Sequence, residues 1–145
     1  MEEKRKIGHI ALVVPDINAA MDFLASLGIT LPPAKNFNLK IKTTFRGKEV
    51  GWDCIITRGK IGSIGLELIQ PTKEGTPYYQ FLKTTGGGIH HISLTGADIK
   101  EDLIYMEKNG AKVISNAVID QDIVAAYLEV EKIPGVVFEL LRGES

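Results

Sequence analysis

The sequence contains little cysteine, little net charge and no long apolar run, and each shortage excludes a class of protein. Its single cysteine, Cys54, cannot form a disulfide within the chain. This suits a reducing cytosol and favours a role as a small buried packing residue. A formal net charge of −1 gives no general attraction to nucleic acid or to an anionic membrane. No apolar stretch could span a bilayer, and the first residues lack the pattern of a secretory signal. We therefore expect a cytoplasmic protein without nucleic-acid or membrane partners.

What the sequence has instead is an ordered succession of strand and helix patterns over 145 residues, enough for one domain with its own core. In the first half, apolar and β-branched runs predict strands at residues 6–14, 37–46, 51–57 and 61–70. Helical spacing predicts a helix that Asp16 caps and Gly28 ends. A short helix beginning near Pro77 and a flexible glycine hinge at residues 86–88 follow. The second half is predicted to contain strands at 89–95, 111–115, 123–131 and 135–141 and one helix after Asp98.

The second half repeats the pattern of the first. In each half a first-strand histidine lies seven residues before the capping aspartate and nineteen before the glycine that ends the helix. These residues are His9, Asp16 and Gly28 in one half, and His91, Asp98 and Gly110 in the other. The last strand of each half carries a glutamate, Glu67 or Glu139. Such agreement predicts a duplicated α+β architecture in a single domain spanning residues 1–145. Its parts are a first module at 6–71, a linker helix and hinge at 72–88, and a second module at 89–142.

The four repeated polar residues predict a metal site. A carboxylate inside an apolar strand is costly unless it is paired, hydrogen-bonded or bound to a metal. Two neutral imidazoles and two carboxylates balance the charge of one divalent ion, and this mixed set suits zinc, nickel, cobalt, iron or manganese. Taken singly, each residue is more typical of an ordinary hydrogen-bonded or solvent-facing strand position. His90, beside His91, is expected to pack or to orient a neighbour rather than to bind the ion.

These residues, with the segments GGGIHHISL and LELIQP, make the chain similar to the vicinal oxygen chelate superfamily, which has the glyoxalase/bleomycin-resistance fold. The resemblance covers nearly the whole chain and implies paired βαβββ modules that form a cupped mixed sheet. Transferred one by one, the family's metal positions fall on His9, Glu67, His91 and Glu139. Family members commonly form dimers, so a homodimer is also expected. Within the superfamily the chain is similar to methylmalonyl-CoA epimerases, with lactoylglutathione lyases as close relatives.

The activity that the resemblance implies is proton transfer at a carbon next to a thioester carbonyl. Glu139 is the candidate for one acid/base, because the family uses this ligand position. Similar epimerases use a second glutamate from the strand before Glu67, and the only acid well inside residues 51–57 is the shorter Asp53. An ordinary solvent-facing role for Asp53 is an equal alternative. Trp52 could line the pocket, although a core position is more typical of a lone tryptophan.

Other activities stay open at this point. One is a lyase that acts on a glutathione hemithioacetal, and another is a protein that binds a small molecule without turnover. An extradiol dioxygenase is disfavoured, because the iron site implied for such enzymes has three protein ligands rather than four. The thiol carrier is open too, because the basic residues that could contact a CoA phosphate are scattered: Lys4, Arg5, Lys6, Arg46, Lys48 and Arg58.

Overall fold

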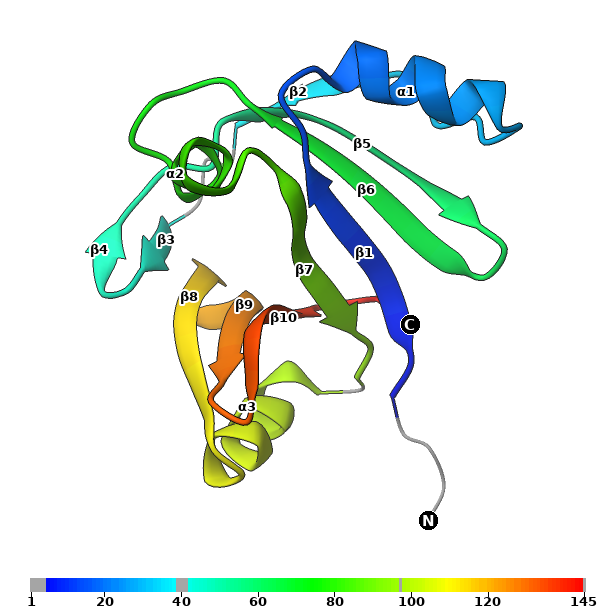
Figure 1. Cartoon of the computed structure of the whole chain (residues 1–145). Helices are drawn as coiled ribbons and strands as arrows, with labels where there is room; N and C mark the ends of the chain where they lie inside the picture. The colour runs from blue at the N-terminus through cyan, green and yellow to red at the C-terminus, as the bar shows by residue number, and fades with distance from the viewer. Residues whose placement is uncertain (1–4, 39–41, 97, 145) are drawn as a thin grey trace. The chain divides into compact units, whose positions relative to one another are not determined.

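The structure is a computed structural model of the chain and describes residues 5–38, 42–96 and 98–144. These residues form ten strands and three helices, with parallel and antiparallel strand pairs (Figure 1). The mixed pairing confirms the predicted α+β class. The described residues divide into two compact units. The first unit contains residues 9–38 and 50–90, and the second contains 5–8, 42–49, 91–96 and 98–144. That the whole chain is one domain with a cupped sheet stays a prediction.

The first unit contains four strands in the order β2-β5-β6-β1. Its strands and helices are β1 (Ile7–Val13), α1 (Ile17–Ser26), β2 (Lys35–Phe37), β5 (Cys54–Ile61), β6 (Ile64–Pro71) and α2 (Pro77–Thr85). Strands β1 and β6 are parallel, whereas β5 and β6 form an antiparallel hairpin. Helix α1 covers one face of these strands, where Ile17 packs with Leu31 and Leu68 (Figure 1). The opposite face, by the alternation of strand side chains, carries His9 and Glu67.

The second unit contains six strands in the order β7-β10-β9-β8-β3-β4. Its strands and helix are β3 (Lys42–Phe45), β4 (Lys48–Glu49), β7 (Gly88–Leu94), α3 (Ile99–Lys108), β8 (Ala111–Ile119), β9 (Asp122–Val130) and β10 (Ile133–Leu141). Strands β7 and β10 are parallel, as β1 and β6 are in the first unit. Helix α3 places Leu103 in a core with Ala126, Leu128 and Leu140. Each unit therefore has a helix on one face of a sheet that contains one central parallel pair.

The three predicted helices are confirmed, and their first residues show why they begin where they do. The carboxylates of Asp16 and Asp98 accept hydrogen bonds from backbone N–H groups in the first turns of α1 and α3. The Thr76 hydroxyl does the same for α2, with Pro77 in the first turn. Helix α2 ends at Gly86, whose φ of 79° favours glycine. None of the helices in the described ranges is long and apolar enough to cross a membrane.

Two of the predicted strands that differ from the structure lie between residues 37 and 57. The single strand predicted at residues 37–46 is wrong: β2 pairs with β5, and the separate β3 pairs with β8. Local sequence does not reveal this break, because the partners of the two strands lie far apart in the chain. The strand predicted at 51–57 instead begins at Cys54 and runs to Ile61. Cys54 lies opposite Pro71, which has no N–H group to continue the ladder.

Candidate metal-binding residues

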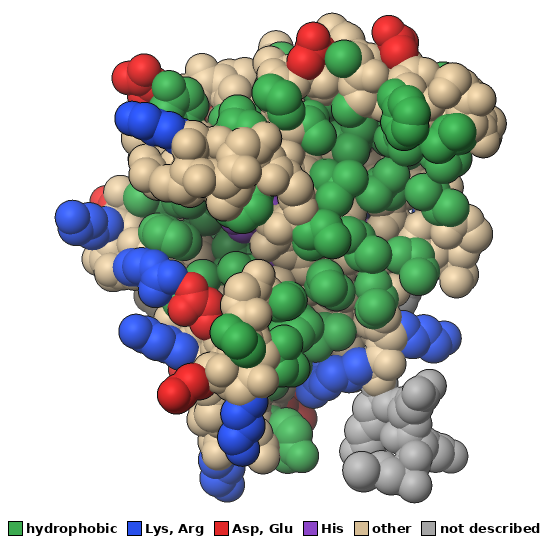
Figure 2. All heavy atoms as spheres, in the orientation of Figure 1, with side chains coloured by type: hydrophobic (Ala, Val, Ile, Leu, Met, Phe, Trp, Pro, Cys, Tyr) green, Lys and Arg blue, Asp and Glu red, His purple; other side chains and the backbone are tan. Residues whose placement is uncertain are grey.

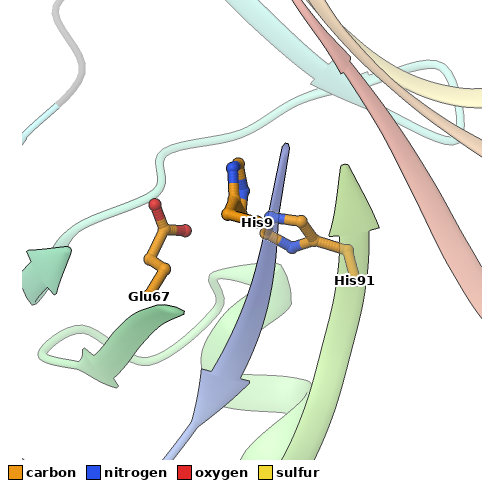
Figure 3. Close-up of side chains that lie close together, drawn as sticks. All are labelled: His9, Glu67 and His91. Carbon is orange, nitrogen blue, oxygen red and sulfur yellow. The ribbon is translucent and has the colours of Figure 1, made fainter. Parts of the chain in front are cut away.

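His9 and Glu67 form a buried pair in the first unit. His9 on β1 lies opposite Gly65, and Ala11 lies opposite Glu67 on β6, so the histidine and the glutamate share one face of the parallel pair. A ring nitrogen of His9 and a carboxylate oxygen of Glu67 lie within 4.8 Å of each other. Both residues are at least 97 % buried, with exposed fractions of 1 % and 3 %. Figure 3 shows the two side chains and the strands from which they project.

His91 and Glu139 form the corresponding pair in the second unit. On β7 and β10, His91 lies opposite Val137 and Ser93 lies opposite Glu139. The imidazole Nε2 of His91 lies 3.6 Å from the Glu139 Oε1. Both side chains are buried. The His91 ring packs against the ring of Tyr127, with 4.9 Å between the two ring centroids. The four predicted ligands are thus brought together as two pairs, His9 with Glu67 and His91 with Glu139.

The two pairs have the same backbone geometry. In each, the residue opposite the histidine lies two positions before the glutamate on a parallel neighbouring strand. The internal repeat of the sequence therefore corresponds to a repeat in strand register. The chemistry also fits a metal ion, because two ligands bound to tetrahedral zinc at ordinary bond lengths lie about 3.4 Å apart. The 3.6 Å separation in the second unit is close to that spacing. That both pairs bind one ion stays a prediction.

Arg58 is a neighbour of Glu67 that the sequence reasoning did not identify. Arg58 lies directly opposite Glu67 in the β5–β6 hairpin. Its Nε donates to the Glu67 Oε2 at 2.8 Å, and its Nη2 donates to the same oxygen. The sequence offered a signal for this contact: a two-residue turn at Gly62 and Ser63 places residues 58 and 67 opposite each other. Arg58 was expected only among the scattered bases that could contact a phosphate.

Asp53 lies just before β5, outside the strand in which it was predicted. It is partly exposed, and its backbone carbonyl accepts a hydrogen bond from the N–H of Thr72 at 3.2 Å. The residues of β5 that alternate onto the Glu67 face are Cys54, Ile56 and Arg58. Asp53 falls outside that alternation, so its catalytic role stays a prediction.

Cys54 has the packing role expected of it. It is 1 % exposed. Burial, followed by the nearby charges of Glu67 and Asp53, raises the pKa of its thiol to about 12. Since the thiolate is the reactive form of cysteine, Cys54 is not a nucleophile at neutral pH.

His90 lies on β7 but falls within residues 50–90 of the first unit, where it packs among aromatic rings, as expected. Its ring lies 5.0 Å from that of Tyr78 and 5.0 Å from that of Phe81, both on α2. Tyr78 in turn contacts Trp52, which is buried in the same cluster. Burial lowers the pKa of His90 to about 4. The ring is therefore neutral at pH 7 and belongs to the core.

A second carboxylate lies near Glu139 and was not anticipated. Ser93, which is opposite Glu139 and fully buried, donates a hydrogen bond from its hydroxyl to the Glu144 carboxylate. Gly8 makes room for this contact, because a Cβ added there would overlap both the carboxylate and the serine hydroxyl. Glu144 lies 51 residues from Ser93, so no local pattern indicated the contact.

Comparisons with known proteins agree with this architecture. A family model described as Glyoxalase/Bleomycin resistance protein/Dioxygenase superfamily matches residues 8–127. No curated protein matches the sequence.

Several solved structures share the fold. A hypothetical protein, BH1468, from Bacillus halodurans C-125 has a TM-score of 0.74 at 24 % identity, covering 96 % of this chain and 94 % of that one. A Streptomyces coelicolor methylmalonyl-CoA epimerase (S115T) in complex with 2-nitronate-propionyl-CoA has a TM-score of 0.67 at 21 % identity, covering 94 % and 92 %. Methylmalonyl-CoA epimerase from Mycobacterium tuberculosis has a TM-score of 0.65 at 16 % identity, covering 93 % and 85 %. At these identities the likeness shows the fold alone.

Proposed function

Because the chain belongs to the glyoxalase/bleomycin resistance protein/dioxygenase superfamily, we propose that it is a metal-dependent enzyme of the cytoplasm. His9, Glu67, His91 and Glu139 would together hold one divalent ion: zinc, nickel, cobalt, manganese or iron. The observation that carries this proposal is the duplicated His–Glu pair, buried and in the same register in both units. A buried carboxylate is costly unless it is compensated; a shared cation would compensate Glu139, whereas Glu67 is also paired with Arg58.

The proposed reaction is epimerisation at a carbon next to a thioester carbonyl, as in methylmalonyl-CoA epimerases. A bound divalent ion would supply positive charge to stabilise the enolate oxygen that develops when the carbon loses its proton. Glu139 would take that proton from one face of the carbon, since a positioned carboxylate is a competent acid/base, and a second acid would deliver a proton to the opposite face. Asp53 is our candidate for the second acid/base, on the opposite side of the substrate carbon. Support for a CoA thioester comes from the similar Streptomyces coelicolor structure, which holds 2-nitronate-propionyl-CoA.

The experiment that tests this proposal is exchange of the substrate's α-proton with deuterated water. Metal-loaded protein should exchange the α-proton of methylmalonyl-CoA, and the same protein stripped with a chelator should not. Turnover of a glutathione hemithioacetal without exchange on methylmalonyl-CoA would replace the epimerase with a lactoylglutathione lyase. Absence of turnover on both substrates, with metal bound, would leave a small-molecule binding protein of the same fold.

We also propose that the protein is a homodimer. Figure 2 shows hydrophobic side chains gathered over α1 and the β5–β6 hairpin of the first unit. Large apolar residues exposed on these elements, or at the C-terminal cap of α1, are Phe23, Leu27, Ile61 and Ile64. An exposed apolar surface of this kind is typical of an interaction site. Sedimentation equilibrium should give twice the mass of the chain, and a monomer at micromolar concentration would contradict the proposal.

A further inference from the structure

Arg58 and Glu67 form an ion pair in which the two partners differ in exposure. The Glu67 side chain is 4 % exposed, whereas that of Arg58 is 42 % exposed. The Arg58 side chain is therefore partly accessible to solvent while its guanidinium contacts a carboxylate inside the protein. Two of its nitrogens donate to Oε2 of Glu67. Arginine is always charged, so this contact neutralises a buried carboxylate that would otherwise be costly.

A metal cation that binds Glu67 would be repelled by the positive charge of Arg58, which already contacts the carboxylate. A metal ion on the carboxylate would lie within a few ångströms of the Arg58 guanidinium, and like charges at that separation repel strongly in a partly buried setting. A guanidinium that withdraws charge from the carboxylate also makes it a weaker metal ligand. Either the ion binds beside Arg58 at a cost in affinity, or Arg58 swings out toward solvent, which its exposure permits.

We propose that Arg58 is a built-in competitor of the metal ion for Glu67, one that stabilises the metal-free protein and lowers its metal affinity. This inference rests on the proposed metal site and adds its regulation. Arg58 acts through Glu67 and is a positioning residue, not a catalytic one. A merely structural Arg58 would support both the fold and the metal site. A competitor supports the fold and opposes the metal.

Lys60 provides a matched control on the same strand. It lies two residues from Arg58, alternates onto the same face of β5 and is opposite Gly65 on β6. It is exposed and carries the same charge. Lys60→Gln therefore removes one positive charge from the same face of the hairpin at a residue opposite glycine rather than glutamate.

The experiment compares wild type, Arg58→Gln, Arg58→Lys and Lys60→Gln. Zinc and nickel affinities are measured by competition with a chromophoric chelator, and the melting temperature is measured on metal-free and zinc-saturated protein. We expect Arg58→Gln to bind zinc at least about tenfold more tightly than wild type and to melt at a lower temperature when metal-free. Zinc should restore most of that difference. Arg58→Lys keeps the charge but lacks the planar guanidinium, so its zinc affinity should lie between those of wild type and Arg58→Gln. Lys60→Gln should stay within about twofold of wild type in affinity, since an exposed charge is screened.

The outcomes separate this inference from the proposed function. If wild type binds zinc and Arg58→Gln binds it equally or more weakly, competition is wrong and the metal site stands. If neither protein binds zinc, nickel, cobalt, manganese or iron(II), both proposals fail. If only Arg58→Gln binds metal, the competitor is confirmed in its strongest form. Should Arg58→Gln fail to fold by circular dichroism, Arg58→Lys decides: tighter binding than wild type supports competition, and weaker binding overturns it.

Discussion

Glu67 and Glu139 occupy equivalent positions in the two units, yet different side chains contact them. Glu67 is held by Arg58, which lies opposite it in an antiparallel hairpin. Glu139 lies 3.6 Å from His91 and opposite Ser93, which itself binds a further carboxylate, Glu144. Both units therefore keep the strand register that presents a histidine and a glutamate on one face, while the neighbours differ. On the proposed function, equivalent positions need not have equivalent chemistry: Glu67 would serve as a ligand alone, whereas Glu139 would also transfer protons.

The strongest test of this comparison replaces each glutamate by glutamine in turn. Glu139→Gln keeps an oxygen ligand but removes the proton acceptor, so epimerisation should fall by about 10²–10⁴-fold. Glu67→Gln should lose no more than about tenfold at saturating metal, equivalent to about 1.4 kcal/mol of barrier. Steady-state rates with methylmalonyl-CoA over a metal titration measure both effects. Equal losses in the two variants would contradict the different roles.

The adjacent histidines offer a second comparison, because His90 packs among aromatic rings whereas His91 lies beside Glu139. The folded-state pKa of His90 is about 4, below its ordinary value of 6.5. Between these pH values the unfolded chain binds a proton that the folded protein does not, so stability falls as pH decreases through this window. From pH 7.5 to pH 4, wild type should lose roughly 3 kcal/mol more than His90→Phe. Urea unfolding at both pH values measures these losses of stability. Equal losses in wild type and His90→Phe would show that folding does not lower the pKa of His90.

Asp53 and Glu139 can be separated by the stereochemistry of exchange. If they serve opposite sides of the substrate carbon, Asp53→Asn should slow inversion by about 10²-fold. Exchange with solvent of the α-proton that Glu139 removes should continue in this variant. Chiral analysis of deuterated methylmalonyl-CoA distinguishes the two processes. Asp120→Asn, at an exposed aspartate in the β8–β9 turn, is the control. Unchanged inversion in Asp53→Asn would assign Asp53 to the surface.

The smallest expected effect concerns the hydrogen bond between Ser93 and Glu144 in the second unit. Ser93→Ala removes the hydroxyl that donates to Glu144, and hydrogen bonds to charged groups contribute about 1.5–3 kcal/mol. Because Glu144 is partly exposed, we expect a loss at the lower end, about 1–2 kcal/mol in free energy of unfolding. The exposed Ser63→Ala, in the hairpin turn, should change it by less than about 0.5 kcal/mol. Equal effects of the two substitutions would mean that the Glu144 contact does not stabilise the fold.

Features set by local sequence could be predicted, and long-range contacts could not. The spacing from His9 to Asp16 and from His91 to Asp98 indicated the repeated strand and capped helix, because caps and periodicity act over a few residues. The same repeat indicated one histidine and one glutamate in each half. The separation of β2 from β3 was missed because β3 pairs with β8, a distant segment. The contact of Arg58 with Glu67 could have been predicted from the register of the hairpin. The contact of Glu144 with Ser93 could not, because the two residues lie 51 positions apart.

The central claim is that both His–Glu pairs hold one ion, and metal stoichiometry tests it most directly. Elemental analysis of protein purified under mild conditions should give one divalent ion per chain in wild type. His9→Ala and His91→Ala, one from each unit, should each lose most of that metal, because a shared site needs both pairs. Two ions per chain in wild type, with half of the metal retained by each variant, would show that the pairs are independent. Full retention of the metal in either variant would contradict the shared site.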